Sequence, residues 1–186
     1  MNLPDMLIPT YTQILGALAS WLRKAQQQLP GSQSEALLTA KLAPDMFPLS
    51  TQVRFACRQA LEGLYRLKQE EFPPEVDVLL EEGRAGAERP GTIEDALARI
   101  AETQTTLEQA GADFAALDPV SALPHTLPNG MTFDFTAEQY GRDWALPQFY
   151  FHVMTAYSIL RAQGIELGKA DYVSHLFGFI RPASDT

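Results

Sequence analysis

The sequence predicts an all-α protein, an antiparallel four-helix bundle with a small β-hairpin between the third and fourth long helices. Four long segments carry apolar residues at the three- and four-residue spacing of amphipathic helices. Residues 127–135 instead combine an Asn-Gly turn with alternating apolar and polar residues, which is typical of a hairpin. At 186 residues and 46% hydrophobic content, we expect one domain over residues 1–186.

The first two helices are predicted from apolar periodicity. In the first helix, the apolar periodicity extends over residues 11–29, and the helix is expected to end at Pro30-Gly31. The second helix follows Pro48 and ends before Phe72-Pro73-Pro74, with Leu49 and Val53 among its inward positions. Its outward positions are charged: Arg54, Arg58, Glu62 and Arg66.

A connection and a third helix follow. Residues 70–91 are charged and rich in proline and glycine, so we expect a mobile connection there, with a short turn at residues 76–80 and no chemistry. Thr92 and Asp95 resemble a capping box, with Asp95 in place of the usual glutamate. The third helix therefore begins here and ends at Gly111.

The fourth long helix is predicted to lie inside the bundle, because apolar or aromatic residues occupy nearly every side of it. Thr136 can cap a short helix that extends through Trp144. Pro147 suits the first turn of the long helix, which continues to Gln163 and stops at Gly164. One more short helix is expected over residues 169–177.

Composition excludes several classes of partner. A formal charge of -9 and a pI near 4.7 argue against nucleic-acid binding, which needs clustered Lys and Arg. No apolar run approaches the roughly 18 residues of a membrane span. The single cysteine, Cys57, excludes an internal disulfide and a multi-cysteine metal site, and it is expected to be an inert buried thiol. We therefore expect a cytoplasmic protein.

His152 is the leading candidate for a functional residue. It lies on the buried fourth helix, four residues after Gln148, so both side chains share one face. Gln52, on the inward side of the second helix, could converge with them in one cavity. The alternative is a structural histidine, neutral and satisfied by a carbonyl or a hydroxyl. For His125 and His175 we expect surface or rim positions.

Two motifs resemble a known family. Residues 43–49 (Ala-Pro-Asp-Met-Phe-Pro-Leu) with Gln52-Val53, together with Leu146-Pro147 through Phe151-His152 and the segment Ile159-Leu160-Arg161, resemble a bacterial family of unknown function. That family belongs to the DinB/YfiT-like superfamily. The resemblance extends from the first helix to Asp171-Tyr172, and it implies a DinB-like bundle.

The resemblance also implies a metal site that has degenerated. Many members of the superfamily hold a divalent metal with three histidines, one on the second helix and two on the last. Here Gln52 and Gln148 stand at two of those positions and His152 at the third. Amides are poor ligands for zinc or nickel, so no cofactor is expected, and His152 is the one candidate metal ligand. We also expect Asp45 and Tyr157 to line the pocket. Asp45 could either cap the second helix or act as a catalytic group.

Three hypotheses for function follow. The first is a small-molecule-binding or stress-related bundle that has lost its metal. The second is a metal-dependent hydrolase or thiol-dependent transferase of the superfamily's type, in which Asp45 completes the site. The third is a homodimer that pairs through apolar helix faces, as relatives often do. Enzymatic activity is left open.

Overall fold

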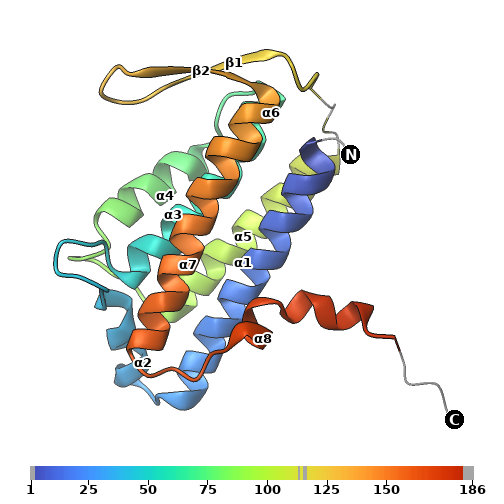
Figure 1. Cartoon of the computed structure of the whole chain (residues 1–186). Helices are drawn as coiled ribbons and strands as arrows, with labels where there is room; N and C mark the ends of the chain where they lie inside the picture. Colours follow the sequence, from blue (N-terminus) through green and yellow to red (C-terminus); the bar gives the residue numbers. More distant parts are fainter. Residues whose placement is uncertain (1–2, 113, 115–116, 182–186) are drawn as a thin grey trace, which may run out of the picture.

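The computed structural model describes residues 3–112, 114 and 117–181. It confirms the all-α fold with a small antiparallel hairpin (Figure 1). The four long helices are α1 (Leu3–Gln28), α3 (Leu49–Lys68), α5 (Ile93–Ala112) and α7 (Leu146–Ala162). Apolar residues of all four form one core, in which most of the predicted apolar positions are buried. Helix α7 is not buried on every side as predicted, because Phe151 and Met154 are exposed, at 59% and 37%.

The long helices pack as two antiparallel pairs, α1 with α5 and α3 with α7. Gln104 of α5 donates to the carbonyl of Thr12 in α1 at 2.9 Å. Toward the C-terminal end of α3, Gly63 lets α1 and Ala145, just before α7, approach α3 closely, because a Cβ on Gly63 would lie 2.5 Å from the Tyr11 hydroxyl and 3.3 Å from the Ala145 Cβ. Lys68 donates to the Ala110 carbonyl at 3.2 Å, so α3 and α5 end at the same end of the bundle.

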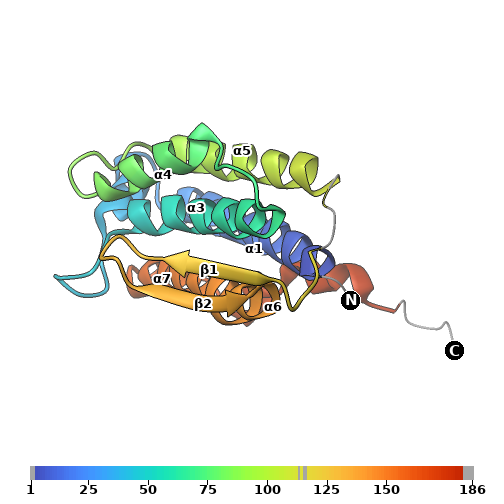
Figure 2. The same cartoon turned by 90° about the horizontal axis from the view of Figure 1, so that it is seen from above.

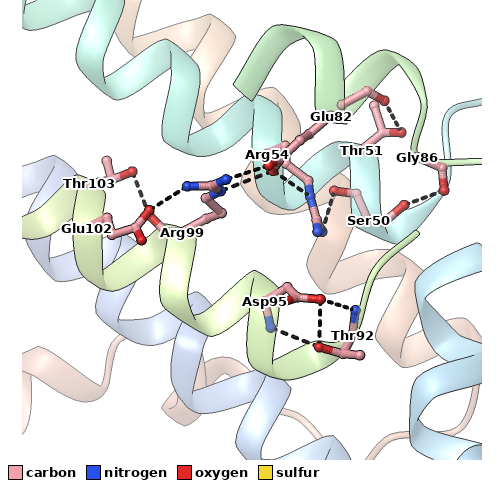
Figure 3. Close-up of polar contacts among 11 residues, drawn as sticks. Ser50, Thr51, Arg54, Glu82, Gly86, Thr92, Asp95, Arg99, Glu102 and Thr103 are labelled. Atoms are coloured by element: carbon pink, nitrogen blue, oxygen red, sulfur yellow. Dashed lines mark hydrogen bonds and ion pairs between the residues drawn. The ribbon is translucent and has the colours of Figure 1, made fainter. Parts of the chain in front are cut away.

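The segment predicted as a mobile connection is instead a helix, α4 (Pro74–Arg84), and that prediction was wrong. Pro74 lies at its first turn, and Glu75 and Asp77 suit its N-terminus. Val76 and Leu79 are buried against α3. Two α3 hydroxyls, Ser50 and Thr51, donate to the Gly86 and Gly83 carbonyls at 2.8 and 2.7 Å (Figure 3). Figure 2 shows α3 lying between α4 and α7.

Because α4 covers this side of α3, the outward position predicted for Arg54 is also wrong. Its side chain is only 4% exposed. The Arg54 Nε lies 3.6 Å from a Glu82 carboxylate oxygen, and Glu82 also pairs with Arg99 of α5 (Figure 3). One carboxylate of α4 therefore joins α4 to both α3 and α5.

The predicted hairpin consists of β1 (Ala122–Thr126) and β2 (Thr132–Thr136), with His125 opposite Phe133. Gly130, with φ of 83°, closes a three-residue loop between Leu127 and Met131, which the Asn-Gly signal did not distinguish from a two-residue turn. Figure 1 shows the hairpin at the end of the bundle where α6 (Ala137–Gln139) begins.

One continuous helical run replaces the predicted short helix and separate fourth helix. Thr136 caps it, with the reciprocal Thr136–Gln139 contacts of a capping box, so the predicted cap is confirmed. A π-helical segment, η2 (Tyr140–Ala145), then leads into α7. There Leu146 N donates five residues back, to Gly141 O, just before Pro147, whose ring would obstruct a regular α-helix. Gly164, with φ of 83°, ends the helix as predicted.

Short elements complete the chain. They are α2 (Ser32–Ala36), η1 (Leu37–Thr39), α8 (Lys169–Tyr172) and the 3-10 helix η3 (Ser174–Phe179). The last predicted helix is therefore two short pieces. Within the described residues, no helix is both long and apolar enough to cross a membrane.

Candidate functional site

His152 of α7 and Gln52 of α3 form a buried hydrogen-bonded pair. The His152 Nδ1 lies 2.9 Å from the Gln52 Oε1, and the Gln52 Nε2 donates to the Phe47 carbonyl at 3.2 Å. Because the amide nitrogen faces a carbonyl, the amide oxygen faces the ring, so Nδ1 carries the proton of the neutral imidazole. Nε2 then keeps its lone pair, and no described residue donates a hydrogen bond to it.

Phenylalanine rings surround this pair. The rings of Phe55 and Phe151 lie edge-on to the imidazole, with centroids at 5.3 and 5.4 Å. Phe47 packs against Phe55, and both Phe47 and Phe151 are more than half exposed. Burial, with a smaller contribution from the charge of Arg58, lowers the pKa of His152 from 6.5 to about 4. At neutral pH His152 is therefore an uncharged hydrogen-bond acceptor close to the surface.

The other predicted pocket residues are less well gathered. Gln148 is half-buried one turn before His152 and makes no hydrogen bond to a described residue. Asp45 is exposed, and the N-cap of α3 is Pro48, so the predicted capping role of Asp45 is wrong. Tyr157 packs against Trp21 of α1, with ring centroids 5.2 Å apart, and so lies on a different side of α7.

These residues do not fit a three-histidine metal centre. The Nδ1 of His152 is engaged by Gln52, and neutral amides bind zinc or nickel far more weakly than imidazole does. In the part of the chain that the structure describes, no three His, Cys, Asp or Glu side chains are gathered so that they could hold a metal ion. Cys57 is fully buried, and burial raises the pKa of its thiol to about 12.

The lowered pKa of His152 predicts a loss of stability in acid. The folded state disfavours the imidazolium, so the unfolded chain takes up this proton first as pH falls. The stability present above pH 6.5 should decrease between pH 6.5 and 4, by about 3 kcal/mol for a depression of this size. Urea unfolding of wild type and His152→Gln across this range measures the difference. An equally steep loss in the variant would contradict the assignment to His152.

A cavity of about 380 Å³ lies between the hairpin, α3, α4 and Trp144 of η2, which precedes α7. Trp144 lines it, and Trp144, Gln148 and His152 follow one another at four-residue spacing. From α3 the walls include Arg58, Glu62 and Arg66, and from α4 they include Leu80 and Arg84. The cavity thus joins elements that lie far apart in the sequence.

His125 of β1 is a further wall residue. A surface or rim position was predicted for it, and the structure buries it in the cavity wall. It is 8% exposed, and its ring lies 4.7 Å from Trp144 and 5.6 Å from Tyr140, measured between centroids. Its Nδ1 is buried and has no hydrogen-bond partner in the described chain. Burial, followed by the charges of Arg66 and Arg58, lowers the pKa of His125. This imidazole is therefore neutral at neutral pH.

Sequence reasoning missed this cavity for identifiable reasons. The arginines of α3 were interpreted as solvated, and residues 80 and 84 fell in the supposed connection. One signal was available. In a hairpin, Leu123 and His125 must point to the same face of β1, and a face that buries Leu123 also buries His125.

A four-helix bundle with a hairpin and a buried histidine on its last long helix defines a DinB-like protein, and the structure is similar to the crystal structure of a DinB family member protein from Shewanella denitrificans. The TM-score is 0.72 at 28% identity, with 99% of this chain and 96% of that chain covered. The model of a domain of unknown function, DUF1993, matches residues 3–173, so the chain belongs to the DUF1993 family. No curated protein matches the sequence.

Proposed function

We propose that this DUF1993 chain is a small-molecule-binding bundle that takes its ligand in the cavity beneath the hairpin, without a three-histidine metal centre. The observation that carries this proposal is the cavity itself. Its volume of about 380 Å³ falls in the range of ligand pockets, roughly 300–1,000 Å³. Apolar side chains, among them Trp144, Leu80 and Leu127, line it together with charged and polar side chains of α3, α4 and the hairpin, so a ligand could find both apolar contacts and hydrogen-bond partners there.

The buried pair at His152 supports the same proposal. Gln52 fixes the orientation of the imidazole, so Nε2 remains an acceptor without a charge. Gln148, between this pair and Trp144, has an amide that no described residue engages. The side of α7 that continues from the cavity therefore offers neutral hydrogen-bonding groups to an extended ligand.

Fluorine NMR of protein labelled with 5-fluorotryptophan tests the proposal. The chain has two tryptophans, Trp144 in the cavity wall and Trp21, which is 1% exposed on α1. We expect members of a library of neutral, cationic and anionic fragments to shift the Trp144 resonance and to leave that of Trp21 in place. Trp21 thus serves as a control within the same molecule.

A matched pair of variants shows where the ligand lies. Leu80→Phe enlarges a side chain of the cavity wall and should abolish the Trp144 shifts by occupying the space. Val78→Phe changes an exposed residue of the same helix and should leave them intact. If no fragment shifts Trp144, or if Leu80→Phe has no effect on the shifts, the proposed binding site is wrong.

A further inference from the structure

The cavity beneath the hairpin carries a charge opposite to that of the whole chain. Three arginines, Arg58, Arg66 and Arg84, line it with a single carboxylate, that of Glu62. The chain as a whole has a formal charge of -9 and only 14 Lys and Arg residues. Concentrating three of these in one hollow creates a locally positive field that low-dielectric walls strengthen.

Only one of these arginines is neutralised. Arg58 donates two hydrogen bonds to the Glu62 carboxylate, at 2.7 and 2.9 Å. Arg66 lies over the ring of Phe72, 5.6 Å from its centroid, and its Nε is buried without a hydrogen-bond partner. Arg84 is exposed and forms no ion pair with a described residue. Two guanidinium groups, one on α3 and one on α4, therefore remain available to an anion.

His125 is the second, independent sign of a missing partner. More than nine-tenths of this residue is buried, yet its Nδ1 makes no hydrogen bond to the described chain. A buried polar atom without a partner destabilises the folded state, because it has lost its hydrogen bonds to water and gained none. A ligand that supplies the partner recovers this cost, and a neutral imidazole can donate one hydrogen bond to an anionic oxygen.

We propose that this cavity binds a small organic anion whose carboxylate or phosphate group lies against Arg66 and Arg84, with His125 beside it, and whose flat apolar part packs against Trp144. The inference rests on the proposed function and adds the chemical class of the ligand. Planar guanidinium groups match both carboxylates and phosphates. Leu80 and Leu127 provide further apolar contact next to the Trp144 ring.

Three probes that differ in charge test the inference: benzoate, phenyl phosphate and neutral benzamide. In titrations at low salt, followed by the fluorine resonance of Trp144, we expect benzoate or phenyl phosphate to bind and benzamide to bind at least about tenfold more weakly. The double variant Arg66→Gln/Arg84→Gln should lose about tenfold or more in affinity for the anions. Arg23→Gln, which removes the same charge from an exposed position on α1, is the control and should change nothing.

The single variant Arg84→Gln should fold normally, because Arg84 is exposed. It should already weaken anion binding measurably, so the test does not depend on the folding of the double variant. If benzamide binds as tightly as benzoate, or if the double variant keeps full anion affinity, the anion inference is overturned. The binding function would still stand, because Trp144 would still respond and Leu80→Phe would still abolish the response. If neither anion shifts Trp144, the anion inference falls, and the fragment library separately decides whether the cavity binds anything.

Discussion

The double variant Gln52→His/Gln148→His is expected to bind Zn²⁺ much more tightly than the wild-type chain. Gln52 Oε1 lies 2.9 Å from a ring nitrogen of His152, and two nitrogens on one zinc at about 2.0 Å each lie about 3.3 Å apart. An imidazole at position 52 can therefore share an ion with His152, and one at position 148 shares its helix face. If each new imidazole raises the affinity for zinc at least tenfold, the two together raise it by at least about 100-fold. Calorimetric titration measures this.

Two controls separate a shared site from a general effect of added histidines. Gln13→His/Gln27→His adds two imidazoles at exposed positions of α1 and should not raise zinc affinity comparably. Adding His152→Ala to the first double variant should remove most of the gain. If the gain survives without His152, or does not appear at all, positions 52, 148 and 152 do not converge on a metal position as the family resemblance implies.

The long elements could be predicted because local sequence determines them. Apolar periodicity located α1, α3, α5 and α7, and the caps at Thr92 and Thr136 are present as predicted. These signals act over one or two helical turns, so no knowledge of neighbouring elements is needed. The π-helical segment is different, because it adjusts the backbone before Pro147 within a continuous run. Helical periodicity alone does not reveal such a shift.

Helix α4 was missed because its stability comes from partners elsewhere in the chain. Its glycines and charges resemble a loop when they are considered alone. In the fold, Gly83 lies against Phe55, where a Cβ would come within 2.3 Å of the ring, and Glu82 meets Arg54. The same residues that weaken the local helix signal allow the close approach to α3.

The candidate site could be predicted only in part, for a similar reason. Helix geometry places Gln148 and His152 on one face, and the family resemblance related Gln52 to them. In the structure Gln52 lies beside His152, with its Oε1 2.9 Å from Nδ1, whereas Gln148 makes no hydrogen bond to either residue. The cavity depends on the docking of the hairpin onto α3 and α4, which brings residues 125–128 together with residues 58–66 and 80–84. No local pattern encodes that contact.

Glu82→Ala is expected to lower the free energy of unfolding by about 2–3 kcal/mol. Arg54 is 4% exposed, and Glu82 is the carboxylate that forms an ion pair with it (Figure 3). Truncation leaves this buried charge with only the weaker interaction with Asp95. We place the loss below the largest values for buried pairs because Glu82 itself is 33% exposed. Urea unfolding at pH 7 measures the change.

Two further variants show whether the unpaired charge is the cause. Glu102→Ala removes an exposed partner of the same Arg99 and should cost no more than about 1 kcal/mol. The double variant Arg54→Met/Glu82→Met removes both charges and should recover most of the loss, because apolar groups of similar volume can replace a buried ion pair. If the double variant is as unstable as Glu82→Ala, the loss comes from the packing of α4 rather than from the Arg54 charge. Equal stability of Glu82→Ala and wild type would mean that Arg54 needs no ion pair with Glu82. The burial of Val76 and Leu79 and the hydrogen bonds of Ser50 and Thr51 would then suffice to keep α4 on α3.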